Sequence, residues 1–196
     1  AANREYNTRN GFGIPLKPSF RGAWDVLCHP HWLLATLLRS TWLDGVPTFA
    51  HYPEAFRSAV TRPSISKRIQ VAQSLSWSDI AQLRKLWPGP LVLKGVLQAD
   101  DARQAMACGL DGVVVSSHGA RNVDSAPAPI DVLPEIVDAV GKHLTVLMDS
   151  GVRRGSDVAK ALALGARGVM VGRLPLWGMA AGGAPGAAHA LELLRQ

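Results

Sequence analysis

The fold is decided by the stretch Val113-Val114-Val115-Ser116-Ser117-His118-Gly119-Ala120-Arg121-Asn122. A run of β-branched residues bounded by small polar residues predicts a buried strand. His118 and Arg121 then follow the C-terminal end of that strand, which is the edge of a parallel sheet that carries catalytic groups. A histidine can accept a proton near neutral pH, and an arginine can bind a carboxylate through two parallel hydrogen bonds. The pair predicts chemistry beside a carboxylate group; the alternative is a loop histidine and a surface arginine.

Strand and helix patterns alternate on both sides of this stretch, from about residue 70 onward. Strands are expected at 91–96, 112–116, 144–148 and 168–171, and helices at 77–86, 100–108, 130–140, 156–164 and 185–194. Ser76 is the expected N-cap of the first helix. Strands that alternate with helices predict a parallel sheet with right-handed crossovers, and four such units are half of an eightfold barrel. We therefore expect an α/β fold in which residues 67–196 form the C-terminal half of a (β/α)8 TIM barrel.

Residues 1–66 differ in composition, because scattered prolines and glycines interrupt a sequence rich in large apolar residues. We expect a long irregular loop segment here, with one short helix from Pro30 through Arg39. Tryptophan and leucine residues lie between basic residues such as Arg21 and Arg39, a pattern that suits a membrane interface. The alternative is a long loop packed on its own domain or on a neighbouring subunit.

Bulk properties exclude several classes of protein. The 196 residues are 47% hydrophobic, which suits one domain with a sizeable core. The net charge is +6, but no Lys/Arg run exceeds two residues and no nucleic-acid-binding motif is present, so we expect anionic ligands or lipid head groups and no nucleic acid. Cys28 and Cys108 fit no metal or disulfide pattern, and we expect no metal site. The sequence shows no signal peptide or transmembrane run, and we expect a cytoplasmic location. Because it starts without Met, we also expect a fragment or a processed chain.

Two turns rich in glycine and arginine follow the last two expected strands and predict a phosphate site. They are Asp149-Ser150-Gly151-Val152-Arg153-Arg154-Gly155 and Gly172-Arg173. Glycine lets backbone N–H groups approach an anion, and a helix N-terminus favours negative charge. In eightfold barrels the loops after strands seven and eight commonly bind phosphate. The alternative is a pair of tight turns with solvated arginines.

Lys94 lies at the C-terminal end of the expected strand 91–96, in an otherwise apolar run. A lysine there needs a partner, and it can place a positive charge beside an electron-rich ring. The alternative is a lysine that extends to solvent at the barrel rim. Asp124 is placed to orient Arg121 or His118, and is equally suited to a surface turn.

Together these motifs resemble the FMN-dependent L-2-hydroxy acid dehydrogenase/oxidase family, which includes mandelate dehydrogenase, flavin-type lactate dehydrogenase and glycolate oxidase. The resemblance is carried, in the family's order and spacing, by Lys94-Gly95, Ser116–Arg121, Asp149–Gly155 and Gly172-Arg173. The stretch from Arg4 to Phe12 also resembles the family's segment after barrel strand four.

The resemblance implies a role for each matching residue. His118 matches the active-site base, Arg121 the arginine that binds the substrate carboxylate, and Lys94 the lysine at the N1/O2 edge of the flavin. Further matches imply contacts to the ribityl chain and phosphate of FMN, made by Asp149, Gly151, Arg153, Gly172 and Arg173. Ser116 matches a residue near the flavin. Arg4 matches a second arginine on the substrate side.

The resemblance further implies the reaction, namely oxidation of an (S)-2-hydroxy acid, mandelate-like or lactate-like, to the 2-keto acid, with electrons passed from reduced flavin to a quinone or similar acceptor. Hydride and carbanion routes both remain open. It also implies a homotetramer and, from the apolar loop after strand four, peripheral contact with the inner face of the cell membrane.

Departures from the family pattern keep two alternatives open. Ser117 replaces the usual Asn, Asn122-Val123 replaces Gln-Leu, and the first four strands, with an active-site tyrosine and the aspartate that pairs with the histidine, are absent from this sequence. The alternatives are another FMN or phosphate-binding barrel, such as one like type 2 isopentenyl diphosphate isomerase, and a half-barrel fragment without catalytic activity.

Overall fold

The computed structural model describes residues 19–52, 54, 57–61 and 75–195. The chain divides into two compact units, Ala1–Gln73 and Ser74–Gln196.

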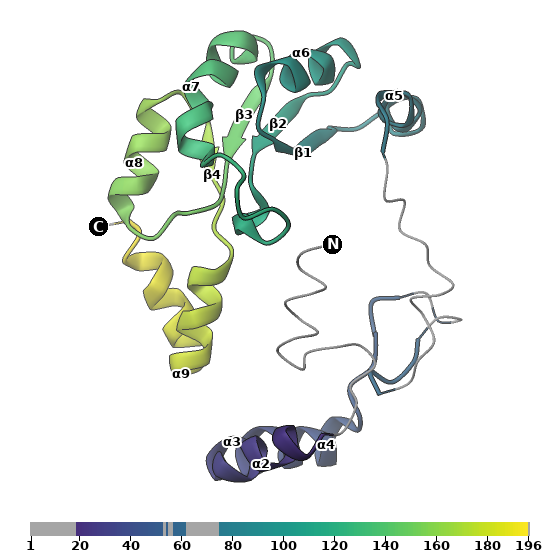
Figure 1. The fold of residues 1–196 in the computed structure, drawn as a ribbon, viewed down its shortest axis with the longest axis vertical. Helices are drawn as coiled ribbons and strands as arrows, with labels where there is room; N and C mark the ends of the chain where they lie inside the picture. Colours follow the sequence, from purple (N-terminus) through teal and green to yellow (C-terminus); the bar gives the residue numbers. More distant parts are fainter. Residues whose placement is uncertain (1–18, 53, 55–56, 62–74, 196) are drawn as a thin grey trace. The chain divides into compact units, whose positions relative to one another are not determined.

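A four-stranded parallel sheet forms the centre of the second unit (Figure 1). Its strands lie in chain order: β1 (Val92–Val96), β2 (Gly112–Val115), β3 (Thr145–Met148) and β4 (Gly168–Val169). The helices between and before them are α5 (Trp77–Leu86), α6 (Ala99–Ala107), α7 (Pro129–Val140) and α8 (Gly155–Ala163). The alternation expected from the sequence is confirmed, and each strand pairs in parallel with the next, as consecutive strands of a barrel do.

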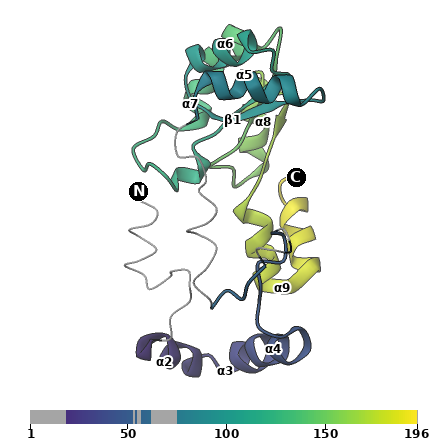
Figure 2. The same ribbon diagram turned by 90° about the vertical axis from the view of Figure 1, so that its right-hand side faces the viewer.

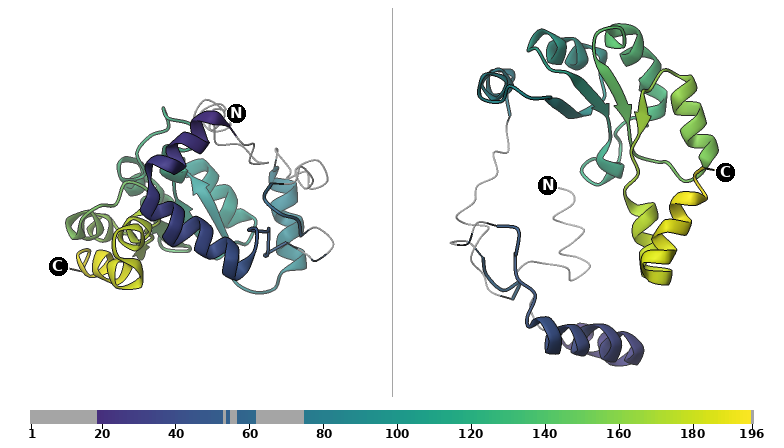
Figure 3. Two further views of the ribbon diagram at one scale, coloured as in Figure 1. Left: turned by 90° about the horizontal axis from the view of Figure 1, so that it is seen from below. Right: turned by 180° about the vertical axis from the view of Figure 1, so that it is seen from behind.

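The core lies between the sheet and the helices α6, α7 and α8, which form a layer along one side of it (Figures 1 and 3). Val113 and Val115 of β2 are fully buried, as are Leu133 and Ile136 of α7. Burial of each such side chain contributes about 1.5–3 kcal/mol. All residues of β2 are buried, so the loop that follows this strand starts from a firmly packed position.

A local signal explains where α5 begins. Ser76 is the N-cap of α5, as predicted, and its backbone N–H donates to the carboxylate of Asp79. The last helix differs from the prediction of 185–194, because α9 covers Arg173–Glu192 and breaks at Gly182 and Gly183.

The two segments of α9 lie side by side (Figures 1 and 2). A Cβ on Gly178 would lie 2.3 Å from the carbonyl oxygen of Gly186, so only glycine permits this approach. The sequence prediction covered the second segment of α9 and missed the first.

The described part of the first unit is mainly helical. Helix α2 covers Phe20–Cys28, and α3 (Pro30–Trp32), the π-helical turn η1 (Leu33–Leu38) and α4 (Arg39–Asp44) follow one another without a gap. The helix expected from Pro30 therefore extends to Asp44, and α2 was not predicted. The segment is more helical than the irregular loop predicted from its prolines and glycines. The reason is that Pro30 and Gly45 lie at helix ends, where these residues are tolerated.

Large apolar side chains of these helices are exposed within the first unit, notably Phe20, Trp24, Leu34, Leu38, Trp42 and Leu43. A membrane-spanning helix, which must be long and apolar, does not occur among the described residues.

Candidate active site

Three predicted site residues meet where β1, β2 and β3 approach their C-terminal ends. Lys94 extends from β1, Ser116 directly follows β2, and Asp149 directly follows β3. The Nζ atom of Lys94 donates a hydrogen bond of 2.6 Å to Oγ of Ser116 and forms an ion pair with Oδ2 of Asp149. Ser116 is only 1% exposed, so the partner that a lysine requires at this position is supplied by neighbouring strands.

The carboxyl group of Asp149 is held in its charged form. Partial burial opposes ionisation, but hydrogen bonds from Lys94, Ser116 and Ser150, together with the charge of Lys94, outweigh burial and lower the pKa of Asp149. The site therefore contains a fixed pair of opposite charges at neutral pH.

His118 lies in a short turn with an uncommon backbone conformation. The φ angles of His118, Gly119 and Ala120 are +55°, +66° and +59°, all in the left-handed region. For a residue with a side chain this conformation costs about 1–2 kcal/mol. The backbone N–H of His118 donates to Oγ of Ser116 at 3.1 Å, and that of Gly119 donates to Oγ of Ser150 at 3.0 Å. These two serines help to hold the turn in place.

The imidazole of His118 packs against Gly95. This glycine lies at an irregularity in the pairing of β1 with β2 and has a φ of +102°. A Cβ added to Gly95 would lie 2.9 Å from Cε1 of His118. The irregularity brings the backbone beside Lys94 into contact with the histidine ring, and no side chain fits between them.

Arg121 follows this turn and is exposed. Within the described part of the chain its guanidinium makes no hydrogen bond or ion pair, so its donors remain available to a ligand. Asp124 is also exposed, and it contacts neither Arg121 nor His118 among the described residues, which favours the surface-turn interpretation for this aspartate.

The predicted phosphate turns lie at the ends of β3 and β4. At Gly151 and Gly172 no atom lies within 4 Å of the place that a Cβ would take, so a ligand can approach the backbone there. The guanidinium of Arg153 lies 4.8 Å from the ring centre of Trp177 and donates to its neighbour's carbonyl, that of Val152. The two turns thus present open glycine backbone beside positively charged side chains.

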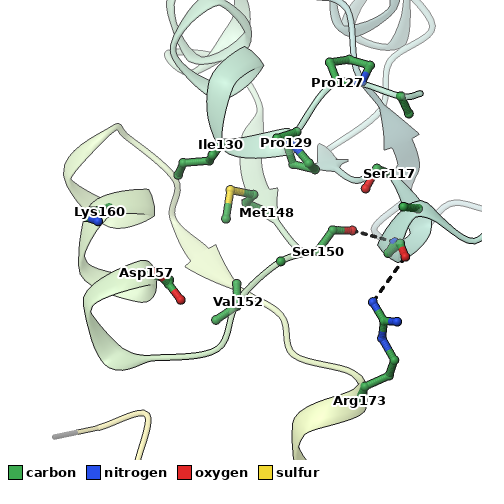
Figure 4. Close-up of a pocket in the computed structure, with 15 residues that line it drawn as sticks. Ser117, Pro127, Pro129, Ile130, Met148, Ser150, Val152, Asp157, Lys160 and Arg173 are labelled. Atoms are coloured by element: carbon green, nitrogen blue, oxygen red, sulfur yellow. Dashed lines mark hydrogen bonds between the residues drawn. The ribbon is translucent and has the colours of Figure 1, made fainter. Parts of the chain in front are cut away.

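Arg173, the first residue of α9, reaches the histidine turn. Its Nη2 atom donates to the carbonyl oxygen of Gly119 at 3.3 Å, and Figure 4 shows Arg173 and Ser150 linked to this turn from two sides. A cavity of about 440 Å³ lies beside these residues, with an apolar wall that includes Pro129, Ile130, Met148 and Val152.

Sequence reasoning assigned no individual role to Ser150 or Gly95 and did not include Trp177 in the site. Gly95 and Ser150 fall within predicted motifs, but their contacts depend on how the strands pair. Arg4 lies outside the described residues. Among the described residues no cluster of three or more His, Cys, Asp or Glu side chains is arranged to hold a metal ion.

Comparison with known proteins identifies relatives along the whole chain. The profile described as FMN-dependent dehydrogenase matches residues 1–196. 2-Hydroxyacid oxidase 1 of Mus musculus is 54% identical over 123 residues, which are 63% of this chain and 33% of that protein. (S)-Mandelate dehydrogenase of Pseudomonas putida is 40% identical over 192 residues, which are 98% of this chain and 47% of that protein. The chain spans about a third to a half of the length of these relatives.

A solved structure supports the same assignment. The crystal structure of the monotopic membrane protein (S)-mandelate dehydrogenase matches with a TM-score of 0.84 and 39% identity, over 97% of this chain and 49% of that one. With the parallel sheet in chain order, this match confirms the prediction of a partial (β/α)8 barrel. Since the profile of an FMN-dependent family matches from the first residue to the last, this chain belongs to the FMN-dependent dehydrogenase family.

Proposed function

We propose that this protein oxidises an (S)-2-hydroxy acid, of the mandelate or lactate kind, to the corresponding 2-keto acid with FMN as its cofactor. Family membership supports the proposal, as do relatives named (S)-mandelate dehydrogenase and 2-hydroxyacid oxidase 1. The observation that carries it is the hydrogen-bonded link between the Lys94–Asp149 pair and the turn that holds His118 and leads to Arg121.

The residues present fit FMN. Open backbone at Gly151 and Gly172, with Arg153 and Arg173 beside it, is suited to the phosphate. Asp149 is suited to the hydroxyl groups of the ribityl chain. When bound, FMN supplies the two-electron acceptor that oxidation of an alcohol requires.

Lys94 has one hydrogen-bond donor to spare for the flavin. An ammonium group has three donors, and Ser116 and Asp149 use two of them. The third, on a side chain that is 39% exposed, can donate to an acceptor on the flavin ring. Its positive charge stabilises negative charge there.

His118 and Arg121 divide the work on the substrate. The exposed guanidinium of Arg121 binds the carboxylate and so fixes the position of the neighbouring carbon atom. The imidazole of His118, held against Gly95, takes the proton that the substrate loses.

The decisive experiment removes the base. In the FMN-loaded protein, His118→Ala is expected to slow flavin reduction by (S)-mandelate or L-lactate roughly 10²–10⁴-fold, the usual range for loss of a general base. The visible flavin spectrum should remain, because the predicted FMN contacts are unchanged. Stopped-flow absorbance measures both quantities.

His143→Ala is the matched control. This histidine is exposed and precedes β3, so it lies at the opposite edge of the sheet, and its removal should leave the rate unchanged. Reduction of the His118→Ala protein at the wild-type rate would show that His118 is not the base. A yellow wild-type protein that no 2-hydroxy acid reduces would favour an isomerase-like barrel instead.

The finer part of the proposal concerns electron transfer and assembly. In this proposal the exposed apolar side chains of residues 20–44 would contact the inner face of the cell membrane. A quinone there would be the electron acceptor, and the protein would act as a homotetramer. Support comes from the matching protein described as monotopic and from Trp24 and Trp42, which are 64% and 89% exposed within their unit.

A further inference from the structure

Ser150 has a backbone conformation that does not suit a serine. Its φ is +75°, in the left-handed region that favours glycine, and the next residue is Gly151 at φ +81°. A side chain at such a position lowers stability relative to glycine. A serine here is therefore less favourable than a glycine, apart from the contacts that its side chain makes.

The hydroxyl of Ser150 joins two elements of the site. Its Oγ donates to Oδ1 of Asp149 at 2.8 Å and accepts the backbone N–H of Gly119 at 3.0 Å. Gly119 directly follows His118, and Ser150 is 31 residues further along the chain. The bond thus fixes the histidine turn to the neighbouring strand end (Figure 4).

The same turn is bound on its other side through Ser116. The N–H of His118 donates to Ser116, Ser116 accepts from Lys94, and Lys94 pairs with Asp149. Asp149 then leads through Ser150 back to Gly119, which closes a ring of hydrogen bonds. Ser116 directly follows β2, which leads into the turn, so Ser150 supplies the link to the end of β3.

The geometry points to Ser150 as a positioning residue for His118, which ties the histidine turn to the Lys94–Asp149 pair through the N–H of Gly119. This inference rests on the proposed role of His118 as the base. The hydroxyl of Ser150 bonds the backbone of Gly119 and the carboxylate of Asp149, so it acts by fixing the backbone that carries the imidazole.

Ser150→Gly separates this role from a structural one. Glycine removes the hydroxyl and also relieves the left-handed strain, so the unfolding midpoint should stay the same or rise. Amide hydrogen exchange at Gly119 should nevertheless accelerate about tenfold. Flavin reduction at saturating hydroxy acid should slow about tenfold, the size expected for one lost hydrogen bond, with little change in KM.

Ser150→Ala and Ser156→Ala complete the set. Ser150→Ala removes the hydroxyl but keeps the strain, so it should show the same exchange and rate changes with a lower unfolding midpoint. Ser156 is exposed in α8, and its replacement should change nothing.

Combined readouts decide the inference. Faster Gly119 exchange together with slower reduction in both Ser150 variants supports it. Unchanged exchange, or faster exchange with wild-type reduction, would overturn it. Failure of the proposed function appears separately, as undiminished reduction in the His118→Ala protein, whereas exchange at Gly119 is measured without any reaction.

Discussion

Gly95 shows how one residue without a side chain can set the position of a neighbouring side chain, here that of His118, the proposed base. Ala at this position would meet Cε1 of His118 at 2.9 Å and would hold an unfavourable φ of +102°. We expect Gly95→Ala to lower the free energy of unfolding by about 1–3 kcal/mol. It should also displace the imidazole and slow flavin reduction by roughly tenfold to a hundredfold. Urea unfolding and stopped-flow absorbance measure the two effects.

Gly109→Ala is the matched control for Gly95→Ala. Gly109 has a φ of +75°, and its nearest neighbour to an added Cβ is 3.8 Å away. Gly109→Ala should therefore lower the free energy of unfolding by a similar amount and leave the rate of flavin reduction unchanged. Equal kinetic losses in the two variants would show that strain alone, without the contact to His118, explains the effect.

Asp149 gives the site a defined response to acid. Because its pKa is lowered in the folded protein, its contribution to stability is complete above the ordinary value of about 3.9 and is lost as the pH falls through the folded value. We expect Asp149→Asn to lower the free energy of unfolding by about 1–3 kcal/mol at pH 7, with a smaller difference at pH 3. Urea unfolding at both pH values measures this.

Asp124→Asn serves as the charge control, since it removes an exposed carboxylate near the same site. The free energies of unfolding of the wild type and of Asp149→Asn are compared at pH 7 and pH 3. If their difference is the same at both values, the ionised carboxylate does not have the role assigned to it.

At the scale of elements, the regular part of the fold was predictable because its signals are local. Ser76 caps α5, and β-branched residues form β2, so strand and helix alternation follows from neighbouring residues. Helix α9 was only half predicted, because its break at Gly182 and Gly183 is visible in sequence but the pairing of Gly178 with Gly186 is tertiary.

For the candidate site, too, the sequence predicts the residues that carry local signals and not the contacts between them. Lys94, His118 and the arginine turns stand out as residue types at strand ends, and strand order then brings their elements to one edge. The bonds of Ser150 and the contact of Gly95 could not be predicted, since both depend on left-handed φ angles and on strand register.

At the scale of the whole molecule, the net charge of +6 and the exposed tryptophans predict binding to anionic lipid. We expect the protein to bind phosphatidylglycerol vesicles, less tightly at high salt because charges are screened. Replacing Trp24 and Trp42 by Ser should weaken binding by roughly tenfold per side chain. Vesicle sedimentation at two salt concentrations measures both effects.

Leu162→Ser, an exposed apolar residue of α8, is the control and should bind vesicles like the wild type. If the double tryptophan variant also bound normally, the segment 20–44 would not be the membrane contact.

The ring of hydrogen bonds around His118 has a consequence for the order of folding. Its members come from three strand ends, and the Lys94–Asp149 pair is separated by 55 residues of chain. The left-handed turn is unfavourable alone, so it becomes populated only after β1, β2 and β3 have assembled. A nascent chain therefore fixes the turn of His118, the proposed base, late, when Asp149 and Ser150 at the end of β3 have come beside the ends of β1 and β2.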